Sequence, residues 1–407
     1  MSMPRSVRHI NESRVLKALF EERGQSRADL ARKLRLTRST VGNIVSNLIQ
    51  SRFVSEQIEN ASDEAEARSG RPSQGLDLNG RGAFFIGADI GAGRLCVVVI
   101  DLRGDIVASN LAYFDAATTN PADAVLRLAE MIKALVKTLD EPGSLRGICL
   151  TLPGVVDHQG VLVRAPSLSW NNVPVRRMLL EQIGDQGTLL VENDANAFAA
   201  GELYRSRDSG TLNTLCVFID TGVGGAIISD GRVMRGHRGY AGEIGHIFLG
   251  TEGFSSFSSL SGTFESYVGI KAVLARYAHH GGTELTLTAL VQAFQSHDSA
   301  AKTTLEEWAW WLGRGLAVLT SVLDPEKIVI GGALVALYPH VEKEVIQSLR
   351  QHLLPEHPFP PVRISNLQEN AAAIGGAAIL HRAFLAIDES VVFEGSDHSP
   401  VRMRSVS

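Results

Sequence analysis

The sequence predicts an α/β protein in which a small helical unit precedes a larger part built from buried strands. Residues 11–53 carry three short patterns of apolar residues at helical spacing. From Ala83 onward, apolar runs of strand length alternate with glycine turns and amphipathic helical segments. The chain of 407 residues is also long enough for two or three domains with cores of their own.

Composition limits the class of protein further. The chain is 44% hydrophobic and 20% charged, which is typical of a globular protein. No apolar run reaches membrane-spanning length, and the opening residues, MSMPRSVRHINESR, lack the apolar core of a signal peptide. We therefore expect a cytoplasmic protein without a membrane partner. Cys96, Cys149 and Cys216 each lie in an apolar, strand-like run, which favours small buried side chains over disulfides or metal ligands.

The net charge of −5 is divided unevenly along the chain. Residues 1–60, which we call the head, hold 11 Lys and Arg against 6 Asp and Glu, whereas the remainder, the body, holds 28 against 38. A basic head on an acidic body indicates a polyanionic partner for the head alone.

Capping residues divide the head into three helices. We expect Asn11 to cap the first helix and Gly24 to end it. Ser26 caps a short second helix, with Asp29 in the capping-box position, and Thr37 caps a third. The apolar residues of the third helix face inward, which leaves a polar face outward near its start: Arg38, Ser39, Thr40 and Asn43.

This arrangement is typical of a helix-turn-helix DNA-binding unit, in which exposed residues at the start of the last helix reach base edges. A plain three-helix bundle with a basic surface is the alternative, but turn spacing, caps and charge together favour DNA binding. Phe53 and Val54 begin a predicted wing strand. Arg68 and Arg71, at the tip of the wing or in the strap after it, are predicted to touch phosphates or the minor groove.

The body opens with strand-turn-strand units. AFFIGADIGAGRLCVVVIDLRGDIVASN predicts two strands around a glycine turn that holds Asp89 and Gly91, followed by a third strand. Further on, TLLVENDANAFAAGELY is a buried strand that delivers Asn193 and Asp194 at its end. Ligands of α/β folds bind at strand ends, and helix capping is the alternative role for both residues.

A second group of polar residues lies on glycine-rich turns. Glu243 and His246 are three residues apart, and Glu265 follows a Ser-rich loop. Carboxylates accept hydrogen bonds from hydroxyl groups, and an imidazole donates or accepts them. Such a set suits the hydroxyl-rich face of a sugar.

These motifs together resemble the ROK family, which groups bacterial sugar kinases with sugar-responsive transcriptional repressors. The run AGEIGH, the loop after it and Glu265 carry the resemblance. It implies a winged helix-turn-helix domain followed by a two-lobed actin-like ATPase (ribonuclease H-like) domain. The sugar-binding residues that it implies are Gly154, Asn193, Asp194, Glu243, His246 and Glu265. In the kinases of the family, the residue matching Asp194 is the general base.

The resemblance also locates two nucleotide-binding loops, of which this chain keeps remnants: Asp89, Gly91, Thr221, Gly222 and Gly224. Ala92, Gly93 and Asp220 depart from the kinase pattern and disfavour ATP, because backbone and hydroxyl groups must approach phosphate there. The family's three zinc cysteines fall on Ser256, Ser258 and Thr263. A neutral hydroxyl is a poor zinc ligand, so we expect neither zinc nor ATP as a cofactor.

Together, the sequence patterns and the resemblance predict five segments. They are a winged helix-turn-helix domain at 1–60, a wing and linker at 61–82, a first lobe at 83–200 with a closing helix at 366–385, a second lobe at 201–365, and a disordered tail at 386–407.

Three hypotheses about function follow from these patterns. The first is a repressor of sugar uptake or catabolism genes, in which a small sugar effector alters affinity for operator double-stranded DNA and no residue is catalytic. A homodimer or higher oligomer is expected, since one short recognition helix gives little specificity. The alternative is an ATP-dependent sugar kinase with an accessory DNA-binding head and Asp194 as its base. The third is a constitutive DNA-binding protein with a vestigial sugar site.

Overall fold

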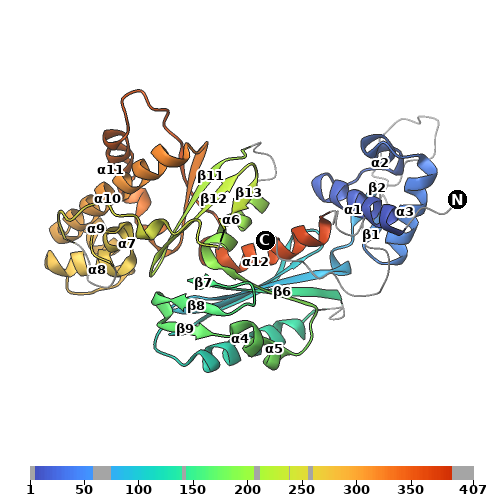
Figure 1. The fold of residues 1–407 in the computed structure, drawn as a ribbon, viewed down its shortest axis with the longest axis horizontal. Coiled ribbons are helices and arrows are strands. Elements are labelled where there is room, and N and C mark those ends of the chain that lie inside the picture. Colours follow the sequence, from blue (N-terminus) through green and yellow to red (C-terminus); the bar gives the residue numbers. More distant parts are fainter. Residues whose placement is uncertain are drawn as a thin grey trace.

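The computed structural model describes residues 5–57, 75–139, 144–205, 211–237, 239–254 and 260–386. Within these ranges the chain forms a helical head and a body of two lobes, with the head at one end of the molecule (Figure 1). Several residues singled out in the sequence lie outside the described ranges: Arg68, Arg71, Ser256, Ser258 and the predicted tail from residue 387.

The head contains the three predicted helices and one strand of a two-stranded sheet, whose other strand lies at Gly75–Leu78. The helices are α1 (Arg5–Glu21), α2 (Arg27–Leu34) and α3 (Arg38–Gln50), and β1 (Val54–Gln57) pairs antiparallel with β2 (Gly75–Leu78). Ser26 and Asp29 form both hydrogen bonds of a capping box, and the Thr37 side chain accepts from the amide of Thr40. These two caps are therefore confirmed.

The predicted cap of the first helix is wrong. α1 begins at Arg5, six residues before Asn11, and Asn11 is buried inside the helix. Its Oδ1 accepts a hydrogen bond from Nη1 of Arg14 at 3.1 Å, so the side chain is used within the helix rather than at its start. The residues before Asn11 carry few apolar side chains, which is why helical periodicity did not reveal the added turns.

The first lobe is a five-stranded sheet in the order β10-β6-β3-β4-β5. Its strands are β3 (Phe84–Ile90), β4 (Arg94–Asp101), β5 (Ile106–Tyr113), β6 (Leu145–Leu152) and β10 (Thr188–Asn193). β4 runs antiparallel to β3 and β5, and β6 and β10 continue the sheet in parallel. A small sheet of β7 (Val155–Val156), β8 (Leu162–Ala165) and β9 (Trp170–Val173) lies beside it.

Helices cover both faces of this sheet. α4 (Pro121–Val136) and α5 (Val175–Ile183) lie on one face (Figure 1). α6 (Asp194–Arg205) and the closing helix α12 (Ala371–Leu385) lie on the other face, between the two lobes. The three cysteines are free and buried, as expected from their apolar surroundings.

The second lobe repeats the topology of the first. Its sheet has the order β13-β12-β11-β14-β15, with β11 (Thr214–Ile219), β12 (Val223–Ser229), β13 (Arg232–Met234), β14 (Lys327–Gly331) and β15 (Val362–Ile364). Again three antiparallel strands are followed by two parallel ones. This duplicated α/β arrangement confirms the predicted two-lobed actin-like fold.

Helices and short turns complete the second lobe. The helices are α7 (Phe264–Val268), α8 (Ile270–His279), α9 (Leu287–Gln295), α10 (Ser299–Leu323) and α11 (Tyr338–His352). Short 3-10 turns occupy Gly80–Gly82, Pro166–Leu168, Ile244–His246, Ala333–Ala336 and Gln368–Asn370. In the described part of the chain, no helix has both the length and the hydropathy needed to cross a membrane.

α12 packs on the first sheet with almost no space between backbones. A Cβ at Gly87 of β3 would lie 1.7 Å from the carbonyl oxygen of Ala373 in α12. Glycine is therefore required at position 87 to let the closing helix approach the sheet.

We predict that Gly87→Ala lowers the free energy of unfolding by about 1–3 kcal/mol, because α12 must shift to admit the methyl group. Urea unfolding of the full chain measures the change. Gly93→Ala is the control, since a Cβ there meets no atom within 4 Å. Equal stability of the two variants would contradict the packing described here.

Candidate functional site

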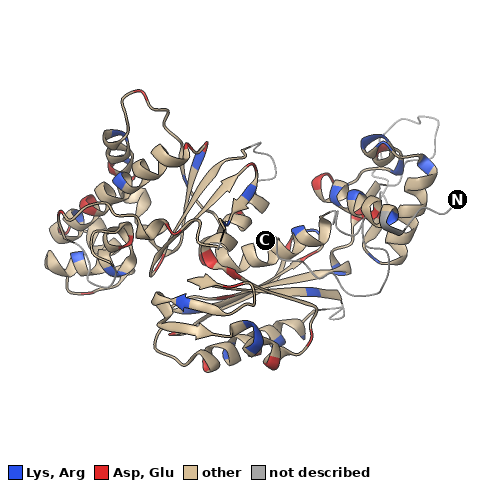
Figure 2. Ribbon diagram, in the orientation of Figure 1, with Lys and Arg blue, Asp and Glu red and all other residues tan. Residues whose placement is uncertain are grey.

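The outward face of α3 carries the residues predicted to contact DNA. Arg38, Ser39 and Asn43 are exposed and Thr40 is half-buried. The opposite face of α3 is buried in the head through Val41, Ile44, Val45 and Leu48. Figure 2 shows Lys and Arg on the helices of the head. The exposed face of α3 is thus polar and belongs to the basic head. The opposite face fixes the helix by packing in the core of the head.

Asn193 and Asp194 lie where β10 ends and α6 begins. The Asn193 Nδ2 donates to the carbonyl oxygen of Gly154 at 3.0 Å, and its Oδ1 accepts from the amide of Asn196 at 3.1 Å. Asn193 therefore caps α6 while it ties the Gly154 turn to the strand end. The carboxylate of Asp194 accepts from the amide of Ala195 at 2.8 Å. Helix capping, the alternative role predicted for both residues, is therefore observed for Asn193. Ligand contact at this strand end stays a prediction.

Two further carboxyl groups and one guanidinium group lie near Asp194. Asp89 is buried at the end of β3 and accepts a hydrogen bond from Oγ1 of Thr151 at 2.8 Å. Arg94, at the start of β4, forms an ion pair with Asp220 at 2.8 Å. The negative charges of both Asp89 and Asp220 act on Asp194. The two segments that were predicted to be remnants of nucleotide-binding loops therefore come together around Asp194.

Burial and like charge raise the pKa of two of these carboxyl groups, Asp89 and Asp194. Burial raises the pKa of Asp89 to about 6, although Arg94 and the Thr151 hydrogen bond act in the opposite direction. Burial, together with the charge of Asp89, raises the pKa of Asp194 to about 7. The charges of Asp220 and Asp89 hold the pKa of Arg94 above its ordinary value against the effect of burial. Arg94 is thus the permanent cation of the group.

Two ion pairs connect the lobes at this site. Arg94 belongs to the first lobe and Asp220 follows β11 of the second lobe, and their side chains are only 14% and 23% exposed. Glu192, at the end of β10, pairs with Arg235, which follows β13. No local sequence pattern indicated these pairs, because each joins residues far apart in the chain. The one local feature that could have pointed to a role for Arg94 is its position directly after a glycine turn.

The second predicted group lies on the other side of the glycine loop that follows β11. A Cβ at Gly222 would lie 2.9 Å from Oε2 of Glu265, and the same oxygen accepts from the amide of Val223 at 2.9 Å. On the opposite side of the loop, a Cβ at Gly224 would lie 3.0 Å from that of Ala195. The amide of Thr221, at the start of this loop, donates a hydrogen bond to the Asp220 carboxylate.

Glu243 and His246 lie next to Glu265. The His246 Nε2 is 3.7 Å from a carboxylate oxygen of Glu243, and both side chains are about half exposed. Burial raises the pKa of Glu243, His246 lowers it, and the charge of Glu265 raises it further. The structure therefore brings these three predicted residues together, with Glu243 and His246 open to solvent. Such an arrangement presents hydrogen-bonding groups to a polar ligand.

The described residues around His246 do not fit a zinc site. Thr263, which occupies the position of a family cysteine, is buried, and its Oγ1 donates to the carbonyl oxygen of Leu260 at 2.6 Å. A neutral hydroxyl committed to a backbone acceptor cannot serve as a thiolate would. Within the described residues, no group of three or more His, Cys, Asp and Glu side chains is arranged to hold a metal ion.

Comparison with known proteins places the chain in a family. The ROK family model matches residues 85–383, and the chain therefore belongs to the ROK family. This match covers the two lobes and the closing helix, including both groups of polar residues described above.

Individual relatives divide into two kinds. The xylose repressor of Bacillus spizizenii is 24% identical over 386 residues, which cover 94% of this chain and 97% of that protein. The glucokinase of Halalkalibacterium halodurans is 29% identical over 315 residues, which cover 72% of this chain and 93% of the kinase. A solved ROK family transcriptional regulator, a homologue of the E. coli MLC protein, matches with a TM-score of 0.75 and 25% identity over 93% of this chain and 97% of its own. Similarity to the two regulators thus extends into the head.

We predict that Asp89→Asn reduces the loss of stability between pH 4.5 and pH 7.5. A carboxyl group whose pKa is higher in the folded chain than in the unfolded chain stabilises the fold while it is protonated, so stability falls as pH rises from about 4 to about 7. The amide removes this titration. The free energy of unfolding of Asp89→Asn relative to the wild type should therefore rise by about 1–3 kcal/mol between pH 4.5 and pH 7.5.

Urea unfolding at the two pH values measures this difference. Asp230→Asn is the matched control, because Asp230 is exposed in a hairpin turn at φ 50, a conformation that asparagine adopts readily. If Asp89→Asn and Asp230→Asn change the pH dependence of stability equally, burial does not raise the pKa of Asp89.

Proposed function

We propose that this protein is a sugar-responsive transcriptional repressor of the ROK family, with a DNA-binding head and a body that binds a small sugar. The observation that carries the proposal is the combination of the two parts. The exposed polar face of α3 is suited to enter a major groove, and the body places Asp194, Glu243 and His246 around one glycine loop. Full-length similarity to a protein named xylose repressor supports the same assignment.

The proposed division of the chain follows the predicted boundaries. Residues 1–60 form the DNA-binding domain and 61–82 the wing and linker. Residues 83–200 with 366–385 form the first lobe, and 201–365 the second. We further propose that the protein acts in the cytoplasm as a homodimer or higher homo-oligomer, because two recognition helices are needed to read two operator half-sites.

The sugar site is proposed to consist of Asp194, Glu243, His246 and Glu265, with Asn193 and Gly154 holding the strand end in place. Asn193 uses both ends of its amide within the protein, so its main contribution is to position Asp194. A sugar bound here would touch both lobes. It would therefore favour one relative arrangement of the lobes, which is the condition for changing affinity for DNA at a distance.

We also propose that the protein has no sugar kinase activity, although its family includes kinases. The ion pair between Arg94 and Asp220 lies between the two remnants of the nucleotide-binding loops. The Asp220 carboxylate occupies a place where kinases of the family commonly have glycine, and it would repel a nucleotide phosphate. Ala92 and Gly93 replace the glycine and threonine of the first loop. The residues present thus do not fit ATP.

The first experiment is a titration of DNA from upstream of the protein's own gene, at one fixed salt concentration, with and without D-xylose and D-glucose. Salt is fixed because phosphate contacts make affinity for DNA steeply salt-dependent. We expect one sugar to change the dissociation constant for DNA by about 5- to 150-fold. Tight binding that no sugar alters would leave a constitutive DNA-binding protein, and absence of DNA binding would reject the proposal.

We predict that Asp194→Asn weakens sugar binding at least about tenfold and leaves DNA binding by the sugar-free protein unchanged. The amide cannot accept from hydroxyl groups with both of its terminal atoms, as a carboxylate does. Calorimetry with the sugar and the DNA titration measure the two affinities separately. Equal loss of both affinities would make Asp194 a structural residue of α6 rather than a ligand contact.

We predict that Asp220→Gly increases affinity for ATP, because it removes a negative charge from the second glycine loop and frees Arg94 to face a phosphate. Calorimetry with ATP compares the variant with the wild type, and thermal unfolding confirms that the variant is folded. Measurable ATP binding and sugar phosphorylation by the wild type would contradict the proposal that the chain is not a kinase.

A further inference from the structure

The head meets the body through a cluster of aromatic rings. Phe20 of α1 packs against Tyr204 of α6 and His381 of α12, with ring centroids 5.6 Å and 4.8 Å apart. His381 also packs edge-on against Phe85 of β3, at 5.1 Å. One ring of the head is therefore in contact with two separate elements of the body, α6 and α12.

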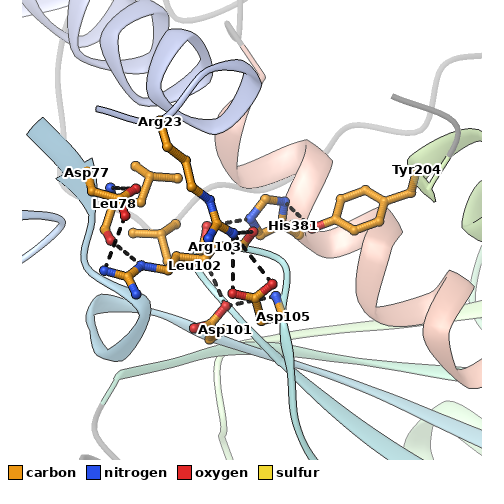
Figure 3. Close-up of polar contacts among 9 residues, drawn as sticks. All are labelled: Arg23, Asp77, Leu78, Asp101, Leu102, Arg103, Asp105, Tyr204 and His381. Atoms are coloured by element: carbon orange, nitrogen blue, oxygen red, sulfur yellow. Dashed lines mark hydrogen bonds and ion pairs between the residues drawn. The ribbon is translucent and has the colours of Figure 1, made fainter. Parts of the chain in front are cut away.

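His381 is fixed in this cluster by two hydrogen bonds. Its Nε2 lies 2.9 Å from the carbonyl oxygen of Leu102, and its Nδ1 lies 3.2 Å from the hydroxyl of Tyr204 (Figure 3). A carbonyl oxygen only accepts, so Nε2 carries a proton and donates. In the neutral ring Nδ1 then accepts, and the Tyr204 hydroxyl is the donor. The hydroxyl thus ties the end of α6 to α12 at the point where Phe20 packs.

α6 and α12 move as one body because their backbones touch. A Cβ at Gly375 of α12 would lie 1.7 Å from the carbonyl oxygen of Ala197, and one at Gly201 would lie 3.3 Å from Gly375. There is no layer of side chains between the helices at this point that could absorb a small displacement. A shift of α6 is therefore passed to α12.

α6 also connects the two proposed functional regions. It begins at Asp194 in the proposed sugar site, and Tyr204 lies ten residues later, about 15 Å along the helix axis. Its first turn touches the second lobe, since a Cβ at Gly224 would lie 3.0 Å from the Cβ of Ala195. A sugar that rearranges this loop or Asp194 acts directly on the start of the helix.

Two polar contacts across the junction involve partly exposed side chains. Arg23 pairs with Asp105 at 3.3 Å, but both side chains are about half exposed, so the pair contributes little to holding the head (Figure 3). The Nε of Arg103 donates to the carbonyl oxygen of Leu78 at 2.7 Å and joins β2 to the turn after β4. The buried hydrogen bond between Tyr204 and His381 is the contact that lies directly at the end of α6.

We propose that Tyr204 and His381 are positioning residues for the head. Their hydrogen bond fixes α1 against the paired helices α6 and α12. Sugar binding at the start of α6 reorients the head by way of this hydrogen bond. The inference rests on the proposed function and adds the route by which the two sites communicate. The route consists of packed backbone and one buried hydrogen bond rather than a chain of surface charges.

The test uses Tyr204→Phe in the full chain, which removes one hydroxyl and keeps the ring that packs on Phe20. The DNA fragment from upstream of the gene is titrated with and without saturating D-xylose or D-glucose, and sugar binding is measured by calorimetry. We expect the sugar-induced change in DNA affinity to fall at least about fivefold. The affinity for the sugar itself should change by less than about threefold.

Tyr338→Phe is the matched control. Tyr338 is a buried tyrosine of the second lobe whose hydroxyl has no hydrogen-bond partner within the described residues, so this variant loses a hydroxyl without losing a link to the head. It should retain the full sugar response. If sugar changes the DNA affinity of Tyr204→Phe as much as that of the wild type, the proposal is overturned. The proposed function still stands in that case, because the wild type responds to the sugar in the same titration.

Amide hydrogen exchange gives a second measurement that needs neither DNA nor sugar. We expect the amides of α1 to exchange faster in Tyr204→Phe than in Tyr338→Phe, because the head is held less firmly. If the wild type fails to bind DNA or sugar, the proposed function is rejected and the exchange rates alone decide the role of the junction. Equal rates in the two variants overturn it.

Discussion

The direct backbone contact between α6 and α12 is the constraint on which the rest of the structure depends. The two helices lie between the sheets of the two lobes, with α12 against β3 and β6 and α6 against β11 and β12 (Figure 1). Gly375 permits this contact, because a side chain there would overlap the carbonyl group of Ala197. The lobes share this helix pair, and the head packs against its far end. Any change at the start of α6 therefore concerns all three parts of the molecule.

The proposal that this chain is not a kinase depends on electrostatics at the lobe boundary. Arg94 and Asp220 neutralise each other across the boundary, and Glu192 and Arg235 form a second pair nearby. Breaking the largely buried pair of Arg94 and Asp220 leaves an uncompensated charge and is costly, so this pair favours one arrangement of the lobes. Burial disfavours ionisation of Asp89 and Asp194 in the first lobe, and the negative charge of Asp220 in the second lobe disfavours it further. Attraction between Arg94 and Asp220 and repulsion between Asp220 and two buried carboxyl groups thus both act across the boundary.

Local chemistry made much of the fold predictable from sequence. Caps such as Ser26 and Thr37, and strand-turn-strand units around glycine, depend on residues close together in the chain. The strand end that carries Asn193 and Asp194 followed from the same signals. The ion pairs and the aromatic junction did not, since Arg94 is 126 residues from Asp220 and Tyr204 is 177 residues from His381. Their partners are chosen by tertiary packing, which no local pattern records.

The most direct test of the account is the distance between the head and the second lobe in the presence and absence of sugar. Spin labels on cysteines at exposed Ser46 of α3 and Gln347 of α11 report it by electron-electron double resonance, because the native cysteines are buried. The account predicts that the distance distribution shifts when a sugar known by calorimetry to bind is added, and that Asp194→Asn abolishes the shift. An unchanged distribution in the sugar-saturated wild type would contradict it.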